Sequence, residues 1–156
     1  MKTVERNLTE FEAHCLPNHH DFEAYDFSDF VYGERIIRST DGQHFALLAF
    51  DDEVVKEVGR LLDEIYLGKL DEIERTDHFD QVFGLTCDPL IGEKLDASIG
   101  IVCPVCKSAK ISHRNFAPPR FKNFVIPVIS HEQWSKMNQE QKRFLIEDGL
   151  RWKGLL

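Results

Sequence analysis

The pair of cysteines at Cys103 and Cys106 carries the most specific chemistry in the sequence. Two cysteines separated by two residues can lie on a tight turn and point both sulfur atoms to one side, which supplies half of a tetrahedral zinc site. The candidate sources of the other two ligands are Cys15, Cys87, His113 and the cluster of His14, His19 and His20. The set Cys87, Cys103, Cys106 and His113 is chemically sufficient and is our predicted zinc site, although a complete zinc ribbon normally has two tight pairs.

The segment from His14 to His20 is a second concentration of metal-binding side chains, with the pattern His-Cys-x3-His-His. Imidazole nitrogen and thiolate sulfur are both zinc ligands, so this segment can bind a metal by itself or complete the site at Cys103. Neighbouring histidines in a loop that contains a proline are more often simply exposed. The sequence leaves both alternatives open.

The same cysteine pair also has a redox interpretation. The run from Cys103 to Lys110, Cys-Pro-Val-Cys-Lys-Ser-Ala-Lys, resembles the active-site turn of glutaredoxins. The tripeptide Val125-Ile-Pro127 resembles the strand and proline that face such a turn in thioredoxin-fold proteins. This short resemblance implies a thiol-disulfide oxidoreductase that uses Cys103 and Cys106, with nearby lysines lowering the thiol pKa. A third interpretation is that both cysteines are unreactive thiols on a turn.

The charge of the chain is unevenly distributed along its 156 residues. There are 27 Asp and Glu against 19 Lys and Arg, a net charge of −8. Residues 1–106 contain 23 acidic and 9 basic residues, a net −14, and residues 107–156 contain 4 acidic and 10 basic residues, a net +6. An acidic composition argues against a typical duplex-DNA binder, because neutralising phosphates needs surplus Lys and Arg. The two parts can instead mark a partner surface or neutralise each other within one folded domain.

Residues 11–30 alternate acidic with aromatic side chains. We predict that these side chains bind a basic protein, with charge steering the encounter and aromatic rings anchoring it. The predicted contact residues are Asp21, Phe22, Glu23, Tyr25, Asp26, Phe27 and Asp29. The sequence has no Gly-rich phosphate loop and no His-Glu-x-x-His or Gly-x-Ser-x-Gly motif. This profile favours a non-enzymatic protein-binding module, such as an inhibitor or immunity-type protein that blocks a basic nuclease-type toxin.

A basic and aromatic stretch near the C-terminal third supports a different function. Residues 113–124 interleave cations with phenylalanines, a pattern that can stack on and neutralise single-stranded nucleic acid. In this alternative the protein is a zinc-knuckle accessory factor whose nucleic-acid contacts are Arg114, Arg120, Phe121 and Lys122. The structural interpretation of the same stretch is a strand that alternates core and solvent-facing residues.

The strands and helices that the sequence predicts around these residues correspond to an α+β fold in a single domain, residues 1–156. An Asp-Gly turn within residues 31–50 indicates a hairpin, and further strands are expected at 98–102, 109–112 and 121–129. Together they form one small antiparallel sheet, with a possible zinc-knuckle hairpin at 98–112. An amphipathic helix capped by Asp51 or Asp52 covers about 51–67. Two short helices end the chain, the first with a predicted capping box of Ser130 with Gln133 and the second with one of Asn138 with Gln141. Residues 11–30 are expected to be irregular or weakly stranded, and residues 69–80 to be a linker or short helix.

The N-terminal segment mixes charges and lacks the apolar core of a signal peptide. No stretch approaches the roughly 18 apolar residues of a membrane helix. We therefore expect a cytoplasmic protein without a membrane partner, whose four cysteines are thiols or metal ligands instead of a disulfide framework.

Overall fold

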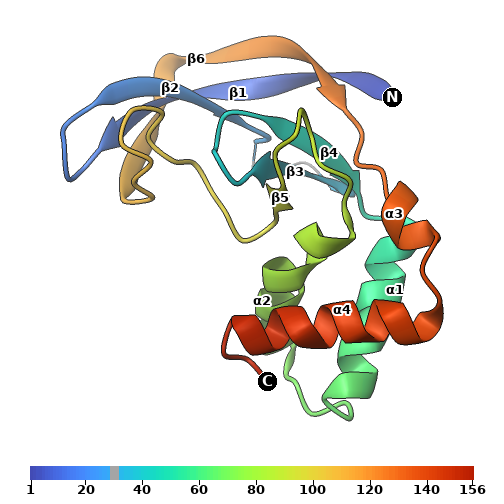
Figure 1. Ribbon diagram of the computed structural model, residues 1–156. Helices are drawn as coiled ribbons and strands as arrows, with labels where there is room; N and C mark the ends of the chain where they lie inside the picture. The colour runs from blue at the N-terminus through green and yellow to red at the C-terminus, as the bar shows by residue number, and fades with distance from the viewer. Residues whose placement is uncertain (29–31) are drawn as a thin grey trace.

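The computed structural model describes residues 1–28 and 32–156, and within them the chain forms an α+β fold, which confirms the predicted class (Figure 1). The strands are β1 (Thr3–Cys15), β2 (Asp21–Asp26), β3 (Glu34–Ser39), β4 (Phe45–Ala49), β5 (Leu95–Asp96) and β6 (Ile111–Pro127). The helices are α1 (Glu53–Ile65), α2 (Glu72–Val82), the short 3₁₀-helix η1 (Phe83–Thr86), α3 (Glu132–Ser135) and α4 (Gln139–Trp152).

The strands form two antiparallel sheets where the sequence predicted one. The first, with strand order β2-β1-β6, we call sheet A, and the second, with order β4-β3-β5, we call sheet B. The difference comes from the N-terminal residues, which form a 13-residue strand and a hairpin where the sequence predicted irregular or weakly stranded structure. Because β1 pairs with both β2 and β6, it is the central strand of a sheet of its own.

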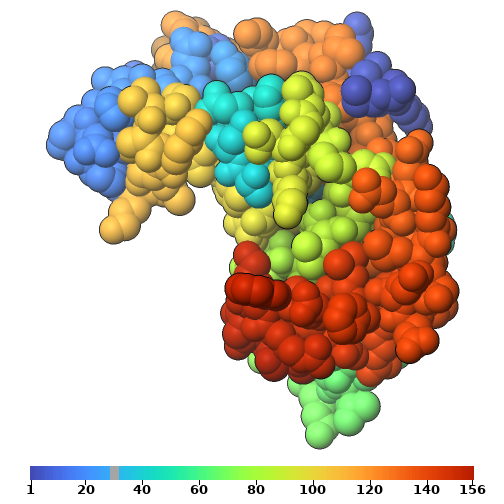
Figure 2. Space-filling view, viewed as in Figure 1, coloured from blue at the N-terminus to red at the C-terminus, as the bar shows by residue number. Residues whose placement is uncertain are grey.

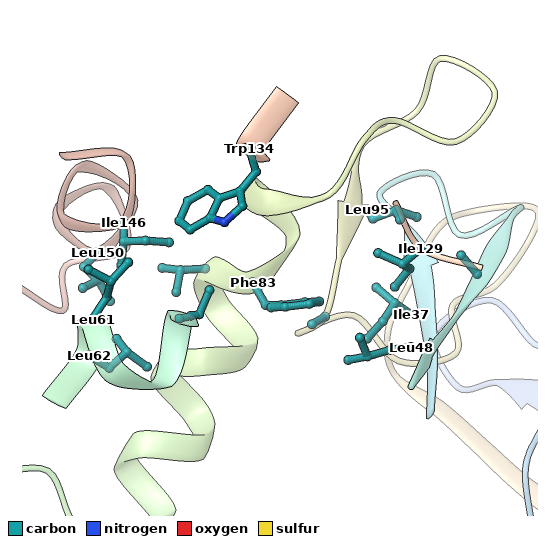
Figure 3. Close-up of a cluster of buried hydrophobic side chains, with 14 of the residues drawn as sticks. Ile37, Leu48, Leu61, Leu62, Phe83, Leu95, Ile129, Trp134, Ile146 and Leu150 are labelled. Carbon is teal, nitrogen blue, oxygen red and sulfur yellow. The ribbon is translucent and has the colours of Figure 1, made fainter. Parts of the chain in front are cut away.

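Sheet B is the middle layer of the molecule, with sheet A on one face and the helices on the other. Successive residues of a strand point to opposite faces, so neighbouring residues of β3 join different cores. Ile36 packs with Leu8 of sheet A, whereas Ile37 packs with the helices. The helical core contains Leu62 of α1 and Phe83 of η1 (Figure 3). Sheet B is therefore buried on both faces, which explains its run of apolar residues.

Capping residues set the helix boundaries. Asp52 accepts a hydrogen bond from the backbone N–H of Val54 at 2.9 Å and begins α1, as predicted. Asn138 and Gln141 form the predicted capping box of α4. Ser130, predicted to cap α3, instead donates to Asp88 at 2.7 Å. The N-cap residue of α3 is His131, which makes no cap bond, and the Asp88 carboxylate accepts from the backbone N–H groups of Glu132 and Gln133 at 2.8 and 3.2 Å. The segment expected as a linker or short helix forms α2.

A single 17-residue strand, β6, replaces the two strands predicted at 109–112 and 121–129. It runs antiparallel to β1, and the register shifts between Glu10, opposite Arg120, and Phe11, opposite Asn115. Residues 116–119 thus bulge from the ladder, which accommodates the two prolines that cannot donate to it. Residues 98–102 form no strand, so the cysteine turn is preceded by an irregular segment.

Figure 2 shows sheet A at one end of the molecule and the C-terminal helix at the other. The gold segment just before β6 lies against the blue β1–β2 hairpin, away from the red α4. Among the described residues, none of the helices has both the length and the apolar character needed to cross a bilayer.

Candidate metal centre

The turn between β1 and β2 carries two metal-binding side chains at its base. Cys15 is the last residue of β1, and His20 immediately precedes β2. The backbone N–H of Cys15 donates to the carbonyl of His20 at 2.8 Å, and the N–H of His19 donates to the carbonyl of Cys15 at 2.8 Å. These bonds close the turn and hold Cys15 and His20 side by side.

The second pair lies on the turn from Cys103 to Cys106. The N–H of Lys107 donates to the carbonyl of Cys103 at 2.9 Å, and the N–H of Cys103 donates to the carbonyl of Ser108 at 2.9 Å. Lys107 takes a left-handed conformation, with φ +63°, which reverses the chain directly after Cys106. A hydrogen bond of 3.0 Å from Leu16 to the carbonyl of Lys110 ties this turn to the β1–β2 turn.

The two turns bring four potential ligand atoms together. The Sγ atoms of Cys15, Cys103 and Cys106 and a ring nitrogen of His20 all lie within 4.8 Å of one another. The Cys15 and Cys106 sulfurs are 3.4 Å apart, and Cys103 Sγ is 3.3 Å from His20 Nδ1. Sulfur and nitrogen ligands of one tetrahedral zinc ion lie about 3.5 to 3.8 Å apart, as the usual bond lengths require. The cluster could therefore bind a single metal ion.

Backbone and amide N–H groups point at the sulfur atoms. Cys103 is buried, which by itself raises its thiol pKa, but N–H groups of Cys106 and Val105 and the His20 ring outweigh burial and lower it. The side-chain amide of Asn18 and the N–H of Ser108 lower the pKa of Cys106 to about 6. Hydrogen bonds of this kind favour the thiolate, which is the form that binds metal.

The other two members of the cluster respond to the sulfur atoms around them. Burial raises the pKa of the Cys15 thiol, although the hydrogen bond from the backbone N–H of Asn18 acts to lower it. Hydrogen bonds to Cys103 and Cys106 raise the pKa of His20. Cys15 and Cys103 are buried, His20 is half-buried and Cys106 is the most exposed of the four. An ion held here is thus shielded from water on most sides.

The structure does not bring the other two predicted ligands, Cys87 and His113, to Cys103 and Cys106. Cys87 follows η1 and packs against the helical core, where its Sγ lies 3.6 Å from the carbonyl of Phe83. Burial raises the Cys87 pKa to about 12, so it stays a thiol. His113 lies on β6 with its ring edge-on to Phe11, the centroids 5.3 Å apart. The second tight pair is instead Cys15 with His20, both of which the sequence offered only among several alternatives.

The residues predicted to contact a protein partner lie on and just after β2, except Asp29, which is outside the described residues. Asp21 and Glu23 are exposed, and Phe22 is half-buried. Tyr25 and Phe27 pack against the core between the two sheets, so their rings are largely covered. Asp26 lies 3.4 Å from the guanidinium of Arg38.

The residues predicted to contact nucleic acid lie on β6, where Arg114 and Arg120 are opposite acidic residues of β1. Arg114 pairs with Glu12 at 2.8 Å. Arg120 lies opposite Glu10 and places its guanidinium 4.0 Å from the ring centroid of Phe116. The side chains of Phe121 and Lys122 are exposed. The acidic residues of β1 thus offset much of the positive charge of this strand.

The surroundings of the cysteine turn differ from those that the glutaredoxin resemblance implies. In that family a long helix contains the second cysteine, whereas here an irregular turn leads from Cys106 directly into β6. Pro127 lies opposite Thr3 at one end of β6, and Ile111 lies opposite Cys15 at the other end. The proline therefore does not face the cysteine pair. Comparisons with protein-family models, with curated proteins and with solved structures found no match to this chain.

Proposed function

We propose that the protein is a non-enzymatic protein-binding module. We also propose that one Zn²⁺ ion, bound by Cys15, His20, Cys103 and Cys106, stabilises its fold. The observation that carries the zinc assignment is the convergence of four ligand atoms from two turns. Three sulfurs and one imidazole nitrogen in a compact group suit tetrahedral Zn²⁺, whereas Mg²⁺ and Ca²⁺ prefer oxygen.

The ligand count supports a structural role for the metal. A catalytic zinc ion keeps one position for water or substrate, whereas four protein ligands fill the tetrahedron. Cys87, whose Sγ contacts Thr86, offers no catalytic nucleophile because its raised pKa keeps it a protonated, half-buried thiol. These observations favour binding over catalysis as the function.

Elemental analysis of purified, untagged protein tests the zinc assignment. We expect about one zinc ion per chain in the wild type and almost none in Cys103→Ser or Cys15→Ser. Cys87→Ser is the matched control, since it removes a half-buried thiol outside the cluster and should retain the metal. Equal zinc content in Cys103→Ser and Cys87→Ser would overturn the assignment.

The partner that we propose is a basic protein, and the charge distribution supports this choice. Residues 51–80, which include α1 and most of α2, contain eleven acidic and four basic residues. Residues 1–28 and 101–127, which include the strands of sheet A, contain six acidic and seven basic residues. The net negative charge of the protein is thus concentrated on the helical end, where it can steer a cationic partner.

An inhibitor or immunity-type protein that blocks a basic nuclease-type toxin fits this size and charge, and it remains our proposed class. The test uses the immobilised, metal-loaded protein and an extract of its own cells. We expect it to retain basic proteins that are released by raising the salt concentration. Glu72→Lys with Asp77→Lys on α2 should abolish this retention.

The comparison variant for that experiment reverses two exposed acids on sheet A, Glu5→Lys with Glu23→Lys, of which Glu23 is one of the contacts predicted from the sequence. This variant changes net charge equally but leaves the helical end intact. If it weakens retention as much as the α2 variant, the binding surface is not on the helices. Retention that is insensitive to salt and to both variants would contradict the proposed function.

A further inference from the structure

The β1–β2 turn presents a second pair of metal-binding side chains that the cluster of Cys15 and His20 does not use. His14 and His19 are each the neighbour of a cluster residue in sequence. Their ring nitrogens, Nε2 of His14 and Nδ1 of His19, are 3.2 Å apart. The His14 side chain is 35% exposed and His19 is exposed, so solvent reaches this pair.

A carboxylate fixes the orientation of His14. Its Nδ1 lies 2.7 Å from Oδ1 of Asp21, the first residue of β2. With the Nδ1 proton donated to Asp21, the Nε2 lone pair faces His19. Histidines that bind metals commonly donate the other ring N–H to a carboxylate, which sets the tautomer and increases the basicity of the ligand nitrogen.

We propose that His14 and His19 bind a second divalent transition-metal ion, exchangeable and at the surface. Two imidazole nitrogens on one tetrahedral zinc ion lie about 3.3 Å apart, given the usual bond lengths, and the observed separation is 3.2 Å. Imidazole ligands suit Zn²⁺, Ni²⁺ and Cu²⁺. This inference is independent of the proposed function, since it concerns different ligand atoms.

The environment explains why this ion exchanges while the one at the cysteines does not. Only two protein ligands face the ion, so water completes its coordination. His19 is exposed, which leaves room for this water, and His14 and Asp21 line a neighbouring groove of about 330 Å³. The turn thus has two sides: Cys15 and His20 face the buried cluster, and His14 and His19 face solvent.

Calorimetric titration of the untagged protein with Zn²⁺ tests this site, after elemental analysis has counted the metal already bound. We expect one additional equivalent with roughly micromolar affinity. His14→Gln and His19→Asn should each abolish it while leaving the metal content at the cysteines unchanged. Asparagine suits position 19 because it tolerates the left-handed conformation there, φ +57°.

Two further variants separate metal binding from a simple hydrogen bond between the rings. Asp21→Asn keeps the shape of the side chain and should weaken the second equivalent about 10-fold or more. His113→Gln removes an exposed imidazole near the same groove but outside the pair, and should bind the second equivalent normally. The proposal fails if the wild type binds no second equivalent, or if the equivalent persists in both His14→Gln and His19→Asn.

Discussion

Cys15 and Cys106 are 91 residues apart in the chain, and their sulfur atoms are 3.4 Å apart. The contact joins the turn of the N-terminal hairpin to the irregular segment that precedes β6. A metal ion bound at this contact would cross-link these two parts of the chain, in addition to the hydrogen bond from Leu16 to Lys110 and the end of the β1–β6 ladder. Because the ion binds the folded protein and not the unfolded chain, its binding energy adds to stability.

Metal removal should therefore destabilise the protein and loosen one segment in particular. At free metal about 1,000-fold above its dissociation constant, binding contributes about 4 kcal/mol to the free energy of unfolding. We expect chelation to lower the free energy of unfolding in urea by this amount. We also expect it to allow trypsin to cleave after Lys107 and Lys110. Cys87→Ser should respond to chelation like the wild type. Unchanged protection of both lysines in the chelated protein would contradict this prediction.

A buried ion pair connects α1 with α4. Lys142 Nζ lies 2.8 Å from Glu57, whose other oxygen accepts a hydrogen bond from the Trp134 indole at 2.6 Å. Lys142→Met should lower the free energy of unfolding by about 3 kcal/mol, because it leaves a buried carboxylate without its cation. Adding Glu57→Gln should recover about half of this loss, since the amide oxygen still accepts from Trp134. Urea unfolding of the double-mutant cycle measures the coupling, and additive losses would argue against it.

A histidine–aspartate pair gives the stability a defined pH dependence. His131 Nε2 lies 2.8 Å from Asp52, the residue that caps α1. Burial alone lowers the His131 pKa, but the hydrogen bonds to Asp52 and to the Thr86 carbonyl raise it above its ordinary value. For Asp52, burial alone raises the pKa. The hydrogen bonds from His131 and Val54 outweigh the effect of burial, so the Asp52 pKa lies below its ordinary value.

The sign of the effect follows from these two directions. The raised His131 pKa stabilises the fold below about pH 6.5, and this contribution is lost as pH rises through the folded pKa. The lowered Asp52 pKa stabilises the fold above about pH 3.9, and is lost as pH falls. His131→Gln keeps a donor for Asp52 but does not titrate. The difference in unfolding free energy between wild type and variant should shrink from pH 6 to pH 9, and a constant difference would count against the pair.

Glycine 42 on the β3–β4 turn sets how closely the cysteine segment approaches sheet B. Gly42 has φ +72°, and a Cβ there would overlap Cγ2 of Val102, the residue before Cys103. Gly42→Ala should cost about 1 to 3 kcal/mol and weaken metal binding, because it displaces Val102. Gly68→Ala is the control, with a similar φ of +69° and open space around it. Equal losses of metal affinity in competition with a chelator would show that the contact is unimportant.

Local signals predicted the helices well. The acid at Asp52 and the box of Asn138 with Gln141 act within one turn of the chain, so short-range sequence patterns contain them. Ser130 failed as a cap because Asp88, distant in sequence, offers its hydroxyl a partner. Sheet A was missed because β1 is stabilised by β6, whose pairing no local window reveals.

The candidate metal centre was likewise predictable in part from local sequence and in part only from tertiary contacts. Cys103 and Cys106 are three positions apart, and their spacing alone identified them. Choosing Cys15 and His20 over Cys87 and His113 required knowing which segments meet, which depends on tertiary contacts. One signal was available: Cys15 and His20 bracket a turn that contains Pro17, as ligands on a hairpin do. Reading the residues before Cys15 as a strand with alternating faces would have indicated that hairpin.

The pairing of β1 with β6 also has a consequence for the protein while it is being made. Glu12 leaves the ribosome 102 residues before Arg114, its partner across the ladder. During most of its synthesis the nascent chain has β2 on one side of β1 and an unpaired strand edge on the other, which is a template for aggregation. Over the same period Cys15 and His20 are present without Cys103 and Cys106, the other two residues of the cluster. Sheet closure and assembly of the cluster of Cys15, His20, Cys103 and Cys106 thus occur together near the end of translation, and until then the nascent chain is exposed to misassembly.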